Sequence, residues 1–290
     1  MGNYKIKDLE QLSGIKAHTI RIWERRYNLI SPDRTDTNIR LYSDKDLKNL
    51  LLVAILNKNG HKISKIVEMP KEERIQLLED NLHVRGEQDA IFDILILSMI
   101  ELDEEKFSSE LEYLFDTFGV LDTFIKYLFP FVERIGIMWK VGSITPVQEH
   151  FITNLIRQKL VSRIDQLKIP NKNHRKILIY LPEHELHEIS VLLYNYIIRS
   201  TGKYTYYLGQ TVPLNDLIKA IDQVQPDAIV TSFITRINKS HIISHLKSIQ
   251  TKPKHKTSIY AGGFQIDSLA DDELPTGVKK ILSTGILLDI

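Results

Sequence analysis

The sequence predicts a multidomain α and α/β protein: a small helical N-terminal domain, a four-helix bundle and a C-terminal doubly wound parallel sheet. Short helical repeats broken by turns precede residue 68, long helical repeats fill 89–169, and short apolar strands alternate with helices over 170–290. A chain of 290 residues, 43% of them hydrophobic, is long enough for two or three cores. We therefore expect domains at 1–68, 89–169 and 170–290, with a linker at 69–88.

Composition narrows the class of protein. The chain has no cysteine, which excludes disulfides, thiolate metal sites and cysteine nucleophiles and fits a reducing compartment. No apolar run approaches the ~20 residues of a membrane span, and the N-terminus lacks a signal-peptide pattern. These features predict a cytoplasmic protein without a membrane partner.

The positive charge is concentrated at one end of the chain. Residues 1–66 hold 13 lysines and arginines against seven acidic residues, a net charge of +6 in a chain whose total is +1. The remainder is therefore negative. A basic module on a nearly neutral protein is typical of phosphate binding.

Two short helices joined by a turn are expected in residues 6–27. The first has an apolar stripe that closes at Gly14: Ile6, Leu9 and Leu12. The second has an apolar side with i, i+3 and i+7 spacing: Ile20, Trp23 and Tyr27. Its opposite side presents His18, Arg21 and Arg25, which are free to reach phosphates or base edges. The alternative is that these arginines only solvate a helix.

The segment after these helices predicts a wing and a helix pair. Pro32 is expected to end the second helix, and residues 34–42 are expected to form a two-stranded wing. Ser43 is a suitable N-cap for a third helix over 44–59, because acidic residues occupy its first turn. Gly60 should stop that helix, and a fourth helix begins at Ile63.

This order of elements resembles the winged helix-turn-helix of the MerR family of transcription regulators. The motifs are Trp23-Glu24-Arg25-Arg26-Tyr27, Pro32-x-Arg34, Arg40-Leu41-Tyr42-Ser43 and Asp46-Leu47, within residues 3–68. The chain has Asn28 and Thr37-Asn38 where the family has glycines, and asparagine tolerates a left-handed backbone. The resemblance implies binding of double-stranded operator DNA. The expected contacts are His18, Thr19, Arg21, Arg25, Tyr27, Arg34, Arg40 and Tyr42.

Residues 89–167 have the apolar spacing of four helices, the last running from about Thr145 to Leu167. The expected inward-facing residues of the first three are Ile91, Leu95, Ile96 and Met99; Phe107, Leu111, Leu114 and Phe115; and Leu121, Ile125, Leu128 and Val132. Such a bundle by itself indicates no function.

After Pro170 the pattern predicts a parallel, Rossmann-like sheet. The expected strands are 176–181, 204–208, 227–233, 258–261 and, as a fifth candidate, 280–283; the expected helices are 188–201, 214–224 and 239–250. In this architecture ligands bind beyond the carboxyl ends of the strands. Those ends are the loops 182–187, 209–211, 232–235 and 262–263.

These loops contain Glu185-x-His187-x-x-Ser190, Ser232-x-Ile234 and Gly262-Gly263. Over about 175–287 they resemble the cobalamin-binding module of methionine synthases, mutases and cobalamin-dependent regulators. The resemblance implies that His187 is the lower ligand of cobalt and that Glu185 holds its other ring nitrogen, which fixes tautomer and basicity. It also implies that Ser232 contacts the displaced nucleotide tail and that Gly262 and Gly263 leave room for it. Ser190 stands where the family has glycine, so its added side chain is the one that would obstruct the approach of the corrin.

Trp139 precedes Glu149-His150 by the nine-residue interval found in light-sensing repressors of the CarH/LitR type. That resemblance implies that Trp139 packs against the upper adenosyl group, that Glu149 hydrogen-bonds it and that His150 lies beside them. The alternative is that Trp139 is an ordinary core aromatic residue. Lys140 stands where the light-sensing members have a histidine, and a protonated lysine is a poor metal ligand.

Together these patterns predict a regulator, and not an enzyme, that binds adenosylcobalamin, with methylcobalamin as the alternative form. We expect repression through a homo-oligomer, a dimer or tetramer, whose assembly depends on the cofactor and on light. Three alternatives stay open: control independent of light, a MerR-type regulator that has lost the cofactor, and a corrinoid methyl-transfer subunit. The DNA-reading module argues against the last.

Overall fold

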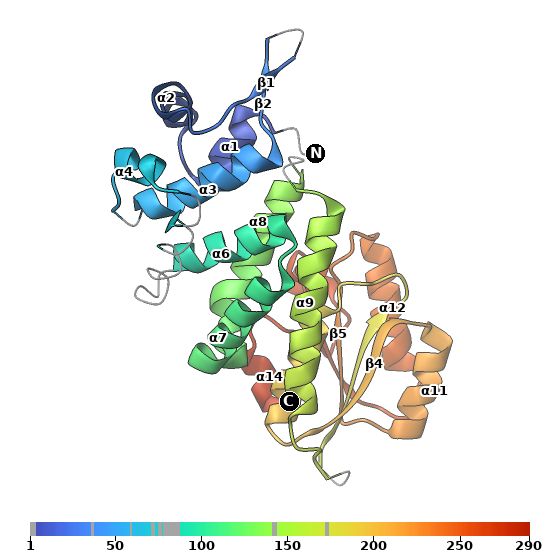
Figure 1. Cartoon of the computed structure of the whole chain (residues 1–290). Coiled ribbons are helices and arrows are strands. Elements are labelled where there is room, and N and C mark those ends of the chain that lie inside the picture. The colour runs from blue at the N-terminus through green and yellow to red at the C-terminus, as the bar shows by residue number, and fades with distance from the viewer. Residues whose placement is uncertain are drawn as a thin grey trace. The chain divides into compact units, whose positions relative to one another are not determined.

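The computed structural model (Figure 1) describes residues 4–35, 38–58, 60–70, 73–74, 77, 88–140, 144–171 and 174–290. The chain forms two compact units, residues 1–155 and 156–290. None of the helices in these described ranges combines the length and apolar character that a bilayer span requires.

The first unit begins with the expected helix-turn-helix and wing. Its elements are α1 Ile6–Ser13, α2 Ala17–Tyr27, β1 Asp33–Arg34, β2 Arg40–Leu41, α3 Asp44–Lys58 and α4 Ile63–Glu68. Gly14 caps α1 with φ 68°, and Asn28 caps α2 with φ 50°, as the tolerance of asparagine for this conformation predicts. The prediction that Pro32 ends α2 was wrong, because the Asn28 N–H already closes the helix on the carbonyl of Glu24.

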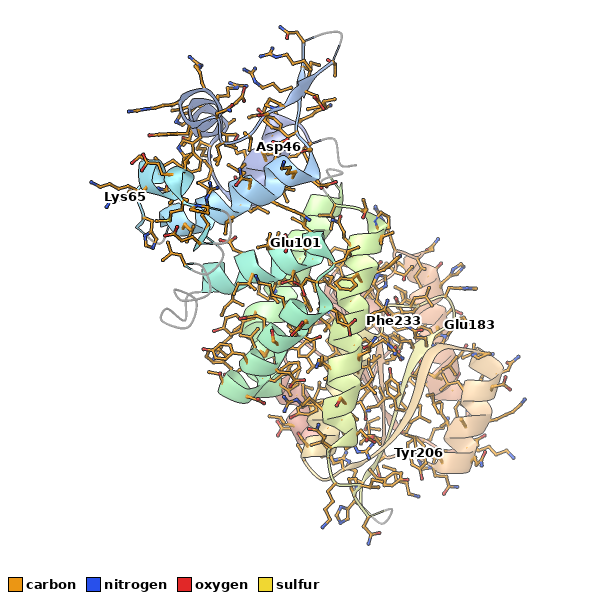
Figure 2. The ribbon with its side chains drawn as sticks, viewed as in Figure 1. Asp46, Lys65, Glu101, Glu183, Tyr206 and Phe233 are labelled. Atoms are coloured by element: carbon orange, nitrogen blue, oxygen red, sulfur yellow. The ribbon has the colours of Figure 1, made fainter. Side chains whose placement is uncertain are left out.

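Asp46 connects the start of α3 to the chain before the wing (Figure 2). The Ser43 hydroxyl accepts from the Asp46 N–H at 3.2 Å, and the Asp46 carboxylate accepts from the Ser43 N–H at 2.9 Å. These reciprocal bonds satisfy donors that a helix start leaves unpaired. The same carboxylate accepts from the Ser31 N–H at 2.9 Å, so the segment after α2 is fixed to α3.

The helical bundle contains a feature that periodicity missed. Its elements are α6 Gln88–Glu101, α7 Glu104–Thr123, the π-helix η1 Phe124–Leu128, α8 Phe129–Lys140 and α9 Pro146–Asp165. Gly119, with φ 77°, separates the second and third expected helices inside α7. The π-turn shifts the inward face, so Phe124 and Leu128 are buried whereas Ile125, predicted to point inward, is 43% exposed.

The second unit is the expected doubly wound sheet. Its parallel strands lie in the order β4 Tyr204–Val212, β3 Lys176–Pro182, β5 Ala228–Ser232, β6 Ser258–Gly262 and β7 Val278–Lys280. The remaining elements are α10 Ile189–Ser200, α11 Leu214–Val224, α12 Lys239–Thr251, α13 Phe264–Asp267, the 3-10 helix η2 Asp271–Glu273 and α14 Gly285–Asp289.

Two strands of this unit differ from the sequence predictions by more than one residue. Residues 209–211, expected as a loop, lie within β4, where Gly209 pairs with Tyr180 next to a break in register. Because a bulge keeps the strand paired, the turn-like Gly209 did not end it. The fifth strand lies at 278–280 and not at 280–283.

The position of β3 explains where this unit places its ligand loops. Its residues 177–181 are fully buried on both faces, as in a central parallel strand. Leu178 and Tyr180 face the core that includes α11 and α12, and α10 contacts the sheet at β3, β4 and β5. The chain moves from β3 outward to β4 and then returns to β5 on the other side. The strand order therefore reverses between β3 and β5, and ligand crevices form at such a reversal.

Candidate functional site

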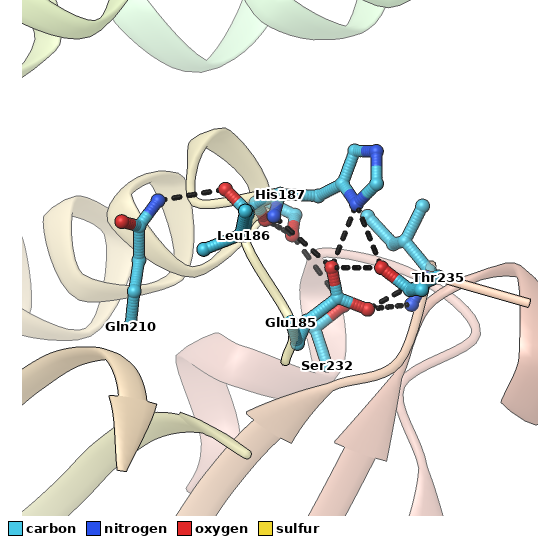
Figure 3. Close-up of polar contacts among 8 residues, drawn as sticks. Glu185, Leu186, His187, Gln210, Ser232 and Thr235 are labelled. Carbon is cyan, nitrogen blue, oxygen red and sulfur yellow. Dashed lines mark hydrogen bonds and ion pairs between the residues drawn. The ribbon is translucent and has the colours of Figure 1, made fainter. Parts of the chain in front are cut away.

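The loops that follow β3 and β5 meet at a buried carboxylate, that of Glu185 (Figure 3). Glu185 is only 3% exposed. One carboxylate oxygen lies 2.6 Å from His187 Nδ1 and accepts the His187 N–H at 3.0 Å. The other oxygen accepts the backbone N–H groups of Ile234 and Thr235 at 2.7 and 2.6 Å. The structure thus brings together residues about 50 positions apart at the switch point of the sheet.

The hydrogen bonds around Glu185 keep it ionised. Burial alone would raise its pKa, but donors from His187, Thr235 and Ile234 outweigh burial and lower the pKa to about 2. The Thr235 hydroxyl adds a further donor at 2.9 Å. A carboxylate anion accepts hydrogen bonds only, so His187 Nδ1 carries a proton, and in the neutral form of the ring the lone pair is on Nε2.

His187 presents that second nitrogen outward. Its side chain is 58% exposed, and Figure 3 shows the far nitrogen of the ring pointing away from Glu185. A neutral imidazole fixed through Nδ1 is a good metal ligand through Nε2. The donor set therefore fits the lower ligand of a cobalt corrinoid, as the sequence predicts.

The two serines of the predicted site are close to each other. Ser232 is fully buried, and its hydroxyl lies 3.4 Å from that of the half-buried Ser190. The side chain that Ser190 has in place of the family's glycine is thus directed toward Ser232. Both hydroxyls adjoin the loop of His187, whose carbonyl lies 3.5 Å from the Ser190 oxygen.

Gly262 and Gly263 follow β6 beside the same crevice. Gly263 has φ +94°, and a Cβ there would lie 2.6 Å from the Phe233 carbonyl oxygen and 2.7 Å from Ser232 Oγ. A Cβ at Gly262 would lie 2.7 Å from the Tyr194 hydroxyl. Gly263 therefore requires glycine because of its backbone angle and the nearby backbone carbonyl, whereas a side chain at Gly262 would require the Tyr194 side chain to move. The sequence predicted room for a nucleotide tail, and contact with the protein itself is an additional reason for the same residues.

Sequence reasoning missed two polar residues that hold this loop. Thr235 lies in the predicted loop 232–235, but nothing in the motif distinguishes it from its neighbours. Gln210 lies in β4, and its side-chain amide donates to the Leu186 carbonyl at 2.7 Å (Figure 3). Both contacts join segments distant in the chain, so the spacing of residues gave no signal for them.

The residues expected on the upper side of the cofactor belong to the first unit. Glu149 lies in the first turn of α9 and His150 follows it, with side chains 37% and 70% exposed and 3.8 Å apart. Trp139 and Lys140 are the last residues of α8. Their side chains are outside the described part of the structure, so their predicted roles stay predictions.

The exposed cationic side of α2 matches the expectation for a DNA-reading helix. His18, Arg21 and Arg25 are exposed, whereas Thr19 and Tyr27 are half-buried. On the opposite side Ile20 and Trp23 are buried. Arg34 in the wing is exposed and donates to the Asn38 side chain.

Two predicted DNA contacts have a different role in this structure. Tyr42 is 1% exposed, and its hydroxyl donates to the Glu24 carboxylate at 3.0 Å. Burial, together with this hydrogen bond, raises the pKa of Tyr42. In this structure the Tyr42 hydroxyl is thus occupied by Glu24, and the DNA contact expected of Tyr42 stays a prediction. Arg40 donates to the other Glu24 oxygen at 3.0 Å, which fixes the wing to α2.

Comparison with known proteins agrees with the helix-turn-helix and identifies the helical bundle. The MerR HTH family of regulatory proteins matches residues 4–73, and the B12 binding domain matches residues 91–162. The HTH-type transcriptional repressor CarH of Myxococcus xanthus is 27% identical over 267 residues, which cover 90% of this chain and 88% of CarH. The chain is a MerR-type regulator with a cobalamin-binding domain. The names of such relatives agree with the prediction of a regulator and not an enzyme.

Other similarities of this MerR-type regulator extend the comparison. The repressor CarA of Myxococcus xanthus is 27% identical over 235 residues, covering 79% of this chain and 76% of CarA. The monomethylamine corrinoid protein of Methanosarcina barkeri has a similar fold, with a TM-score of 0.57 at 14% identity over 70% of this chain and 97% of that protein. The second similarity concerns the fold alone. It agrees with the predicted helical and Rossmann-like domains.

Proposed function

We propose that this MerR-type regulator is a transcriptional repressor whose operator binding is controlled by cobalamin held at His187. One observation supports this most strongly: an imidazole fixed by a buried carboxylate directs its second nitrogen away from that carboxylate at the switch point of a doubly wound sheet. The exposed cationic face of α2 supplies the DNA-reading surface. CarH and CarA, repressors by name, support the direction of control.

The residues that would hold the cofactor are the predicted ones. His187 would ligate cobalt from below, Glu185 would keep its Nδ1 protonated, and the tail would lie near Ser190, Ser232, Gly262 and Gly263. Trp139, Glu149 and His150 would contact an upper adenosyl group, so adenosylcobalamin is the proposed form and methylcobalamin the alternative. Bound adenosylcobalamin supplies a cobalt–carbon bond that light cleaves.

Control through assembly follows from electrostatics. A single helix-turn-helix neutralises too few phosphates for tight operator binding at cellular salt, so several modules must act together. We propose that the cofactor stabilises a dimer or tetramer in the dark and that light loosens it. Lys140 replaces the histidine that traps cobalt after illumination in light-sensing members. This chain should therefore return to the dark state on addition of fresh cofactor more readily than they do.

The test uses the full chain incubated with adenosylcobalamin in the dark, and operator fragments selected from a random duplex pool under those conditions. We expect bound cofactor with histidine coordination, an oligomer on size exclusion and operator binding, the last two reduced by light. His187→Ala should lose the coordination, whereas the matched loop variant His184→Asn should keep it; asparagine suits the left-handed backbone at position 184, where φ is 68°.

The outcomes separate the alternatives. Absence of cofactor uptake by the natural chain would show that the site has lost cobalamin. Uptake and photolysis with the same oligomer and the same operator affinity in dark and light would reject light sensing and leave cobalamin control of DNA binding to be measured as loaded against cofactor-free protein. Equal affinity in those two forms would reject the proposed function.

A further inference from the structure

A second carboxylate lies directly after the proposed cobalt ligand. Glu188 is 8% exposed and has no role in the cobalamin motif. One of its oxygens accepts from Arg157 Nε of α9 at 2.6 Å, and the other accepts from the Tyr207 hydroxyl of β4 at 2.8 Å. We refer to Glu188, Arg157 and Tyr207 as the Glu188 clamp.

The Glu188 clamp fixes the second end of the histidine loop. The Glu188 carbonyl accepts the Leu192 N–H at 3.0 Å, so this residue also begins α10. Burial and the hydrogen bond to Glu188 raise the pKa of Tyr207, which therefore remains a donor at neutral pH. A buried carboxylate with two such partners has little freedom to move, since the loss of either would leave charge poorly compensated.

His187 thus lies between two anchored carboxylates. Glu185 holds the loop toward Ile234 and Thr235 after β5, and Glu188 holds it toward α9 and β4. A metal bound to His187 Nε2 would restrict the motion of the loop that contains both Glu185 and Glu188. The Arg157 guanidinium carries that constraint to α9, the helix whose first turn contains Glu149.

We propose that the Glu188–Arg157 ion pair couples the cobalt-binding loop to α9, so that occupation of His187 stabilises this helix. The inference rests on the proposed function, because it assumes that His187 binds cobalamin. Arg157 and Glu188 are positioning residues in this scheme, and neither touches cobalt.

Amide hydrogen exchange of the full chain, with and without aquocobalamin, tests the coupling. Aquocobalamin has no adenosyl group, so it reports on the histidine loop without upper adenosyl contacts. We expect the cofactor to slow exchange in α9 around Arg157 by about 5-fold or more in the natural chain. In the double variant Arg157→Met/Glu188→Gln the cofactor should still bind with the histidine-coordinated spectrum, but the slowing in α9 should fall below about 2-fold.

The double variant is designed to fold, because both charges are removed together and the introduced glutamine retains an acceptor for the Tyr207 hydroxyl. Lys219→Met is the matched control: it breaks the Lys219–Asp216 ion pair on α11, whose side chains are 76% and 66% exposed, and should leave α9 protection intact. Tyr207→Phe offers a second variant, in which Arg157 remains paired and the slowing should persist.

Three results would overturn the inference. Equal protection of α9 in the double variant and the natural chain would show that the ion pair transmits nothing. Aquocobalamin bound with histidine coordination but without any effect on α9 in the natural chain would reject the coupling and leave the proposed function standing. Failure of the natural chain to bind aquocobalamin would instead reject the proposed function, and this inference with it.

Discussion

The helix-turn-helix domain (residues 4–68) and the second unit (residues 156–290) each contain a poorly exposed glutamate that holds neighbouring side chains in place. The two glutamates have different structural roles. Glu24 has a side chain 16% exposed and binds Arg40 and Tyr42, which lie 16 and 18 positions away. Glu185 has a side chain 4% exposed and binds His187, two positions away. Glu24 holds the polar groups of Arg40 and Tyr42 against α2, whereas Glu185 holds His187 so that its second ring nitrogen points outward.

The difference shows that residue type alone does not define a contact. Arg40 and Arg25 are both arginines in family motifs, yet Arg40 is ion-paired to Glu24 and Arg25 is exposed on α2. A ring with two nitrogens can hold a carboxylate with one nitrogen and direct the other elsewhere. In His187, Nδ1 faces Glu185 and Nε2 points away from it.

The largest expected effect is on cobalamin affinity, and it should come from neutralising Glu185, the carboxylate that orients His187. Glu185→Gln removes the charge that fixes His187, and loss of such a partner lowers metal affinity about 10- to 100-fold. Titration with aquocobalamin, followed by its absorption spectrum, measures this loss. Glu183→Gln, at an exposed glutamate of the same loop (Figure 2), should bind like the natural chain. Equal affinities of the two variants would remove Glu185 from the site.

The next effect concerns the exposed arginine of α2. Arg25→Ala should weaken operator binding by about 10-fold, the range expected for one phosphate or guanine contact. Fluorescence anisotropy with the selected operator measures this affinity. Cobalamin uptake and the melting temperature should not change. A joint loss of DNA affinity and stability would show that Arg25 supports the fold.

Tyr42, the buried partner of Glu24, should affect the stability of the fold and leave operator affinity unchanged. Tyr42→Phe removes one hydrogen bond from a carboxylate and should reduce the free energy of unfolding by about 1 kcal/mol. Urea denaturation of the cofactor-free chain gives this value. Operator affinity, measured at urea concentrations well below the unfolding transition, should stay near that of the natural chain. A loss of operator affinity at unchanged stability would show that Tyr42 contacts DNA.

The smallest expected effect is a pH dependence of stability caused by His245, a second histidine of residues 156–290 that differs from His187 in its surroundings. His245 lies 2.8 Å from the Tyr180 hydroxyl, and burial lowers its pKa to about 4. Because the folded-state pKa is below the unfolded value of 6.5, this stability is present above pH 6.5 and is lost as pH falls toward 4. From pH 8 to 6 the loss should be about 0.8 kcal/mol.

His245→Gln is the control for that pH dependence. It removes the titrating group and leaves a polar side chain next to Tyr180, so the difference in unfolding free energy between pH 8 and 6 should become smaller. Chemical denaturation of both chains at the two pH values measures this. An unchanged difference would assign the pH dependence to other groups.

The limits of sequence reasoning follow the same contrast. The helix-turn-helix, the alternation of strands and helices and the Glu185–His187 pair were predictable because caps, apolar periodicity and a two-residue spacing are local. The role of Glu24 was not, since its partners come from the wing, nor was Glu188, whose partner Arg157 lies 31 positions away. The inward face after Gly119 was misplaced because a π-turn adds a residue to a repeat that otherwise looks regular.

The division of the Glu185 network between two loops also sets an order during synthesis. Residues 4–73 are synthesised before the loops of the Glu185 network, and the carboxylate acquires its full set of donors only after Thr235 has been added. At about 5–20 residues per second, roughly 10 to 30 s separate these events. Each newly made chain therefore has a DNA-reading module before it has a complete ligand loop.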